Sequence, residues 1–259
     1  MSAITIPALL SVDEYVLPAD VVSMIGNGSS DSGSDKIDFY EIDRVEYFNK
    51  LEGFWLGQSI ANWTGLITEM DKIGNIGEIK TGKFYTRNNW GGKDEPSIWS
   101  SESSYDQINF VLKEPGQIWG SDDDTDIEYM YQELLYDSDQ IILSAKKIRD
   151  GWIKHIKYEE ENFLWVSNQK AFDLMQDGLL PPETSDPSLN EHYDMIDAQL
   201  TTEIFGLLSP VNYKSALKMS NLPIRTTARG DAASISDFYV IIHSLASVSY
   251  THLTLPTKA

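Results

Sequence analysis

Residues Trp119 to Leu135 read WGSDDDTDIEYMYQELL, and this stretch decides how the rest of the chain is interpreted. Five acidic side chains lie within seven residues, directly after a Gly-Ser pair. The apolar residues that follow recur at helical spacing, and they are Ile127, Met130, Tyr131, Leu134 and Leu135. Spacing of three, four, seven and eight is typical of one buried face of an amphipathic helix. The stretch therefore predicts a turn followed by a helix, with the carboxylates in the turn and the first helical turn.

These crowded carboxylates have two interpretations. Aspartates at a helix start cap free N–H groups and interact favourably with the positive end of the helix dipole. Asp122, Asp123 and Asp124 in a row, followed by Thr125, exceed what capping needs, and carboxylates that repel one another are most easily held around a hard cation. An EF-hand is rejected, because its sixth loop position would be Ile127 where the sharp turn requires glycine. A hard-metal site and a solvated acidic cap both remain open.

Composition narrows the class of function. The chain has 259 residues, 41% of them hydrophobic, and a formal net charge of −20, which suits one sizeable domain or two small ones. A chain this acidic will not follow a phosphate backbone or an anionic membrane without a local basic patch, and none stands out, so we expect neither nucleic-acid nor membrane binding. The absence of cysteine excludes disulfides and zinc-thiolate sites. The first residues lack the features of a signal peptide, so we expect a cytoplasmic protein.

The rest of the chain predicts a mainly α-helical protein. Residues 1–43 pass through the stretch NGSSDSGSD and are interpreted as an N-terminal extension and flexible linker. Residues 74–104 resemble a long loop, and residues 179–190, with three prolines, a connection. Helical spacing recurs in residues 44–70, 139–149, 152–176, 195–208, 212–220 and 232–246. We therefore expect an all-α, single compact multi-helix domain over residues 44–247.

The last residues have a different character. VSYTHLTLPT, residues 248–257, reads like a translated sequencing-library adapter, although a short natural β-segment is the alternative. We therefore interpret residues 248–259 as an artefactual tail and expect the helical domain to be incomplete at its C-terminus.

Residues 44–70 carry a row of small side chains. Gly53, Gly57, Ala61 and Gly65 are spaced by four, so on a helix they line one side, and Glu69 ends that side. A neighbouring helix or a ligand could approach the backbone closely there. Tight helix packing, with Glu69 as an ordinary surface charge, is the alternative to a ligand site.

Two segments together resemble the ADP-ribosylglycohydrolase family. The family's first motif, G-x-x-x-G-x-x-x-G-D-A-x-G-x-x-x-E, is matched by the glycines of this row and by Glu69, with Ala61-Asn62-Trp63 in place of Gly-Asp-Ala. Its T-D-D-T motif corresponds to residues 122–125, where Asp122 replaces the first threonine. Residues 180–185 and 196–210 resemble its middle region, and Thr227-Ala228 stands where the family has a Thr-His pair. The resemblance covers residues 44–247.

The resemblance implies an all-α fold with two Mg²⁺ ions, or Mn²⁺, in a cleft that binds ADP-ribose. The catalytic residues it implies are Glu69, Asp123 and Asp124, and the metal ligands are Glu69, Asp122, Asp123, Asp124 and Thr125. The positions expected beside the bound cofactor are Asn62, Gly120 and Ser121. The family's late D-T-D-T motif, which supplies the other half of the metal site, is not found in this chain.

The function implied is Mg²⁺-dependent hydrolysis of the bond between ADP-ribose and a protein side chain or a small-molecule conjugate. The partner would then be an ADP-ribosylated protein or an ADP-ribose conjugate. A non-catalytic ADP-ribose-binding relative with a degenerate site is an alternative, and an acidic helical interaction protein without a ligand is another.

Overall fold

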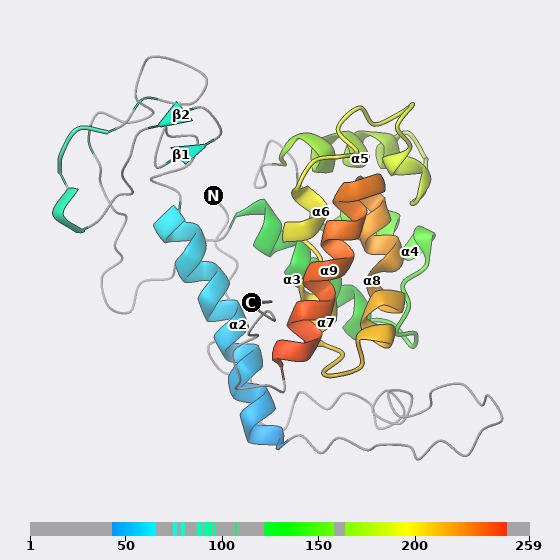
Figure 1. The fold of residues 1–259 in the computed structure, drawn as a ribbon. Coiled ribbons are helices and arrows are strands. Elements are labelled where there is room, and N and C mark those ends of the chain that lie inside the picture. The colour runs from blue at the N-terminus through cyan, green and yellow to red at the C-terminus, as the bar shows by residue number, and fades with distance from the viewer. Residues whose placement is uncertain are drawn as a thin grey trace, which may run out of the picture. The chain divides into compact units, whose positions relative to one another are not determined.

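The computed structural model describes a mainly helical protein (Figure 1). The described residues are 43–65, 87–89, 91–94, 122–157 and 164–247, with 75–76, 79–80, 96 and 107. The helices are α2 (Arg44–Gly65), α3 (Asp123–Tyr136), α4 (Ala145–His155), α5 (Val166–Gln176), α6 (Asp197–Leu200), α7 (Ile204–Leu207), α8 (Tyr213–Thr227) and α9 (Gly230–Ala246), with 3₁₀ turns η2 (Arg87–Asn89) and η3 (Glu183–Ser185). A short antiparallel pair, β1 (Asn75–Ile76) with β2 (Ile79–Lys80), completes the described elements. The prediction of a mostly helical fold is confirmed for this part of the chain.

The contacts divide the chain into two compact units, where the sequence led us to expect one domain. The first unit comprises residues 1–53 and 122–259, and the second comprises residues 54–121. Helices α3 to α9 belong to the first unit, which is described below. The predicted linker at 1–43, apart from Asp43, and the predicted tail at 248–259 lie outside the described residues.

Helix α3 forms where the apolar spacing predicted it. The side chain of the N-cap residue Asp122 accepts a hydrogen bond from the Thr125 backbone N–H, at 3.0 Å. Ile127, Met130 and Tyr131 are buried along one face of the helix, and Leu134 continues that face. The helix begins within the acidic run, which agrees with the rejection of an EF-hand loop.

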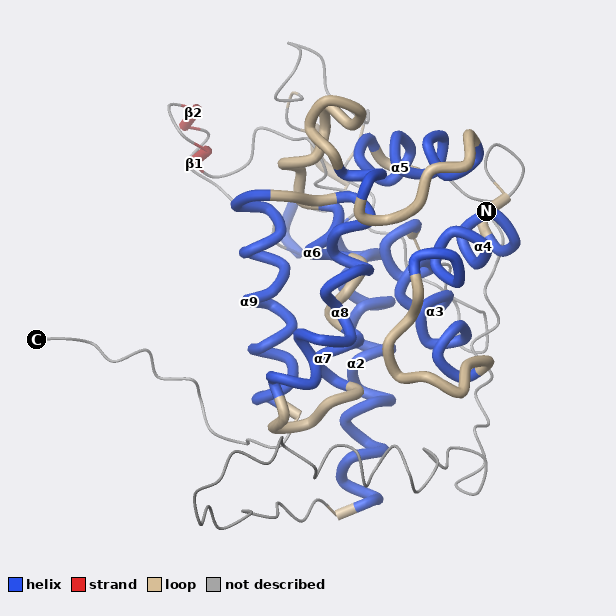
Figure 2. Tube along the Cα trace, turned by 90° about the vertical axis from the view of Figure 1, so that its right-hand side faces the viewer, coloured by secondary structure: helices blue, strands red, loops and turns tan. Residues whose placement is uncertain are grey.

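The core of the first unit is built around α9. Helices α6, α7 and α8 all pack against it, and Figure 2 shows α8 and α9 lying side by side. Gly206 of α7 sets how closely α7 approaches α9, since a Cβ there would collide with the Val240 carbonyl oxygen and the Ser244 backbone nitrogen. The Tyr47 hydroxyl donates to the Leu207 carbonyl, at 2.7 Å, and so attaches the first turns of α2 to α7.

Two predicted helix boundaries are wrong. We expected helices over 139–149 and 152–176, whereas α4 begins at Ala145 and continues to His155. Ser144 starts the helix because its hydroxyl accepts a hydrogen bond from the Lys147 backbone N–H, at 3.2 Å. Gly151 does not end it: a Cβ at this position would collide with the Leu134 side chain of α3. The glycine therefore lets α4 lie close to the Leu134 side chain of α3.

The row of small residues on α2 has an open surface. Helix α2 is confirmed from Arg44 to Gly65, but a Cβ added at Gly53, Gly57 or Gly65 would meet no atom within 4 Å. The close helix packing that this spacing allows is therefore not formed at these three glycines. None of the helices among the described residues combines the length and apolar character needed to cross a membrane.

Candidate functional site

Three consecutive aspartates begin α3 and form the centre of the candidate site. Asp122 is the N-cap residue, and Asp123 and Asp124 lie in the first helical turn. All three side chains are half-buried. Asp123 reaches across to the start of α5, where its Oδ2 accepts a hydrogen bond from the Trp165 backbone N–H, at 3.0 Å. The acidic turn is thus held against a second helix.

A fourth carboxylate, that of Asp197, enters the cluster from α6. Its Oδ2 accepts hydrogen bonds from the backbone N–H groups of Ser167, at 2.9 Å, and Asn168, at 3.3 Å. The Ser167 hydroxyl also donates to this oxygen. Asp197 is buried and therefore caps α5 from a distant part of the chain. Its charge also raises the pKa values of Asp123 and Asp124.

Glu128 adds a fifth carboxylate, one turn further along α3. It is fully buried, and its Oε1 accepts a hydrogen bond from the Ile204 backbone N–H, at 2.8 Å. This bond joins α3 to the start of α7. The charge of Glu128 contributes to the raised pKa of Asp124.

Burial and the repulsion between carboxylates raise the pKa values of Asp123 and Asp124. Burial is the largest cause that raises the pKa of Asp124, to about 9, and the neighbouring carboxylates add to it. Burial also raises the pKa of Asp123 to about 6, although the hydrogen bond from Trp165 opposes the shift. At neutral pH Asp124 therefore holds a proton unless a cation offsets the surrounding negative charge. Shifts of this size are concentrated at functional sites in proteins.

Asn168 lies beside the cluster with an unsatisfied side chain. It is fully buried, and neither its Oδ1 nor its Nδ2 has a hydrogen-bond partner among the described residues. Its backbone N–H donates to Asp197, which places the residue next to the carboxylates. Buried amides are almost always hydrogen-bonded, so an exception calls for a bound water, ion or ligand. An amide that can both donate and accept is suited to a ligand hydroxyl.

The end of α8 carries a second buried polar side chain with no hydrogen-bond partner among the described residues. The Thr227 hydroxyl is buried and has no hydrogen-bond partner. Ala228, which follows it, is also buried, with 1% of its surface exposed. These are the two residues that stand in place of the Thr-His pair of the family that the sequence resembles.

The structure brings together only part of the predicted site. Asp122, Asp123 and Asp124 are adjacent, and Thr125 is buried with its backbone N–H bound to Asp122. Asn62 lies half-buried on the part of α2 that belongs to the second unit. The other predicted residues, Glu69, Gly120 and Ser121, lie outside the described residues.

The cluster offers the kind of donor atoms that Mg²⁺ prefers. The described residues do not form a complete set of Mg²⁺ ligands. Carboxylate oxygens are the donors that Mg²⁺ prefers, and burial together with the neighbouring carboxylates raises the pKa of Asp124. Within the described part of the chain, however, no three His, Asp or Glu side chains are placed to hold one ion. The described residues would thus supply one side of a site at most.

Sequence reasoning missed Asp197 and Asn168, and it counted Glu128 in the acidic run without assigning it to the site. Asp197 stands in a segment that predicts a helix, where a single carboxylate is usually solvated. A polar pair directly after an apolar run, Ser167-Asn168 after Phe163-Leu164-Trp165-Val166, was the available signal for a helix start. It could not indicate that the cap comes from a residue 30 positions away in the chain.

Comparison of the chain with models of protein families, with curated proteins and with solved structures finds no match. The resemblance to the ADP-ribosylglycohydrolase family therefore depends on the two sequence motifs.

Proposed function

We propose that this chain is a Mg²⁺-dependent hydrolase of the ADP-ribosylglycohydrolase type, which releases ADP-ribose from a protein side chain or a small-molecule conjugate. The observation that carries the proposal is the half-buried run of Asp122, Asp123 and Asp124 at the start of α3, beside which the buried carboxylates of Asp197 and Glu128 lie. A protein retains a half-buried cluster of like charges at a cost to its stability, which a bound cation offsets. The order and spacing of the two motifs support the choice of family.

The residues can be assigned roles in such a reaction. Carboxylates of the run from Asp122 to Asp124 would supply one side of a Mg²⁺ site, with Mn²⁺ as a substitute, and Glu69 would act as a further ligand or as general base. When bound, the metal would lower the pKa of its water and orient ribose hydroxyls. Cleavage of the glycosidic bond passes through an oxocarbenium-like state that needs this activated water. The Asn168 amide would hydrogen-bond a hydroxyl of the bound ligand.

Binding of ADP-ribose without turnover is the second candidate function. Asn62 replaces a carboxylate of the first motif, and the buried Ala228 offers no imidazole to a ligand. The incomplete set of metal ligands among the described residues also favours this alternative. Both candidates share the same ligand, so one binding experiment tests them together and an activity assay separates them.

The first test is calorimetric titration of ADP-ribose into the full chain, with Mg²⁺ or with EDTA. Mg²⁺-dependent binding supports the family assignment, and Mg²⁺-dependent release of ADP-ribose from a modified protein then identifies the hydrolase. Tight binding without release identifies the binding protein. A folded sample that binds neither Mg²⁺ nor ADP-ribose would refute both.

Substitution of Asp123 tests the metal site directly. Asp123→Ala is expected to weaken Mg²⁺ binding while the fold stays intact, because the carboxylate cluster repels itself when no metal is bound. Asp139→Ala, an exposed aspartate in the loop before α4, is the matched control and should leave Mg²⁺ affinity unchanged. Equal Mg²⁺ affinity in all three proteins would sink the assignment of Asp123 as a ligand.

A further inference from the structure

The outer face of α4 is a concentration of positive charge in a strongly acidic chain. Residues 146–157 contain five of the chain's 20 Lys and Arg residues and a single carboxylate, Asp150, while the whole chain has a net charge of −20. The helix buries Ile148, Gly151 and Trp152 on its inner side. Helical periodicity places Lys146, Arg149, Ile153 and Lys154 on the opposite side. We call these four residues the α4 face.

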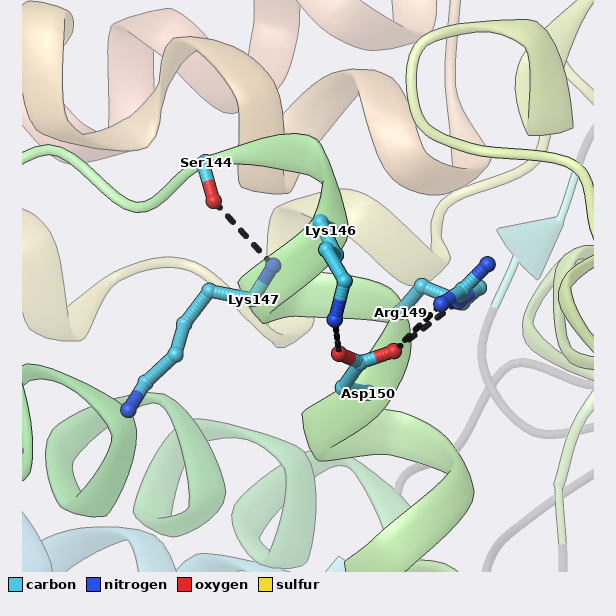
Figure 3. A network of polar contacts seen from close by, with 5 residues as sticks. All are labelled: Ser144, Lys146, Lys147, Arg149 and Asp150. Carbon is cyan, nitrogen blue, oxygen red and sulfur yellow. Dashed lines mark hydrogen bonds and ion pairs between the residues drawn. The ribbon is translucent and has the colours of Figure 1, made fainter.

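An ion-pair network orders the charges of the α4 face (Figure 3). Asp150 Oδ1 accepts hydrogen bonds from Arg149 Nε, at 3.0 Å, and from Arg149 Nη2, at 2.6 Å. Its other oxygen, Oδ2, is paired with Lys146 Nζ. The pairing is exposed and contributes little to stability. One carboxylate thus holds two cationic side chains in position, and a net positive charge remains.

Lys147 has a different role from its neighbours. Its Nζ donates to the Asp137 carbonyl oxygen, at 3.0 Å, where α3 ends. This bond satisfies one of the free carbonyls at the end of that helix. Lys147 therefore belongs to the packing of α4 on α3, whereas Lys146, whose side chain is 72% exposed, is available on the α4 face.

Ile153 gives the α4 face an apolar centre. It is 44% exposed, and its helical position lies between those of Arg149 and Lys146. A single exposed isoleucine is ordinary, but one surrounded by ordered cations matches the pattern of an interface with an apolar centre and a charged rim. A phosphate backbone has no group that would cover Ile153, and the net negative charge of the chain opposes an extended polyanion. A short acidic peptide with one apolar side chain can pair with the cations of the α4 face and can also cover Ile153.

We propose that the α4 face docks an acidic polypeptide segment of a partner protein. Carboxylates of that segment pair with Lys146, Arg149 and Lys154, and an apolar side chain of the segment covers Ile153. Helix α4 has 11 residues, so its face is about 16 Å long and accommodates a few residues of the partner on each side of the apolar contact. The proposal is independent of the proposed hydrolase function.

Fluorescence anisotropy of the full chain with a labelled peptide tests the docking surface. The probe is a peptide of alternating Glu and Ser with one central Leu, and the expected result is binding at low salt that weakens more than tenfold as salt is raised, since the pairs are exposed. Lys146→Glu with Lys154→Glu should weaken binding more than tenfold. Ile153→Ser should weaken binding of the Leu peptide but not of a peptide with Ser at the centre.

The matched control is Lys214→Glu with Lys218→Glu, a pair of exposed lysines on α8. It changes the net charge of the chain by the same amount and should leave peptide affinity within about twofold of wild type. Equal loss in both double variants would mean that general charge attraction explains binding, and would overturn the proposal. A single-stranded oligonucleotide of equal length that binds the α4 face more tightly than the peptide, or no peptide binding at low salt, would also overturn it.

Discussion

Two aspartates on neighbouring helices, Asp124 of α3 and Asp150 of α4, experience opposite environments. Asp124 is half-buried among carboxylates, and its pKa is raised to about 9. Asp150 is exposed between two cationic side chains, and hydrogen bonds from Lys146 and Arg149 lower its pKa. In the sequence, Asp124 stands out as part of the run of three aspartates, whereas Asp150 is an ordinary residue of an amphipathic helix. The difference shows that the surroundings of a carboxylate, and not its helix position, determine its protonation.

The contrast also separates two uses of charge in this chain. At α4 the charges are paired in water, where they cost little and present a surface to other molecules. At the start of α3 carboxylates are gathered where burial disfavours their charged forms. The second arrangement lowers stability unless a ligand offsets it, which is the pattern of a functional site.

The largest expected effect is that of Asp124→Asn on stability without metal. The pKa of Asp124 in the folded state, about 9, lies above its ordinary value of 3.8, so the folded state binds more protons and the free energy of unfolding falls as pH rises from about 4 to 9. Removing the charge should raise the free energy of unfolding by on the order of a few kcal/mol near pH 8, and by less near pH 5. Urea denaturation in EDTA at several pH values measures this. A gain that is equal at all pH values would contradict the assigned pKa.

Mg²⁺ binding should depend on pH for the same reason. A cation must displace the proton of Asp124, so the apparent affinity should rise about tenfold per pH unit below the pKa of this group. Titration in two buffers of different ionisation enthalpy should show about one proton released per binding event near pH 7. Mg²⁺ affinity that does not vary between pH 6 and 8 would separate the cluster from metal binding.

A smaller effect is expected from backbone strain in the first unit. Val211, between α7 and α8, has a φ of 64°, which is unfavourable for a β-branched residue. Val211→Gly should stabilise the protein by about 1 kcal/mol, and its backbone N–H can keep the bond to the Ser244 carbonyl, at 2.9 Å. Unlike the gain from Asp124→Asn, this gain should be the same at pH 5 and pH 8. A loss of stability would mean that packing of the valine side chain outweighs the strain.

The smallest effect is expected for Asp150, the second of the two aspartates compared above. Asp150→Asn should leave the urea midpoint and its pH dependence unchanged, because exposed ion pairs contribute little. It should strengthen binding of the acidic peptide to the α4 face, since it removes a negative charge that pairs with Lys146 and Arg149. A clear drop in the urea midpoint would show that the ion-pair network is structural.

Much of the helical framework follows from local sequence. The spacing of Ile127, Met130 and Tyr131 predicts the buried face of α3, and these residues are buried. The run of prolines predicts the connection after α5, which is found at η3. Such features depend on helical periodicity and on hydrogen bonds within a few residues, and both can be read from neighbouring positions.

The sequence by itself determined the helical class and the acidic turn of three aspartates. Only the tertiary structure shows that α4 continues through Gly151 and that this glycine faces the Leu134 side chain of another helix. It also brought Asp197, 73 positions after Asp124, close enough to raise that residue's pKa. Long-range packing sets which carboxylates share a buried region and which amide, that of Asn168, is left without a partner. These relations depend on contacts between helices, and no local pattern encodes them.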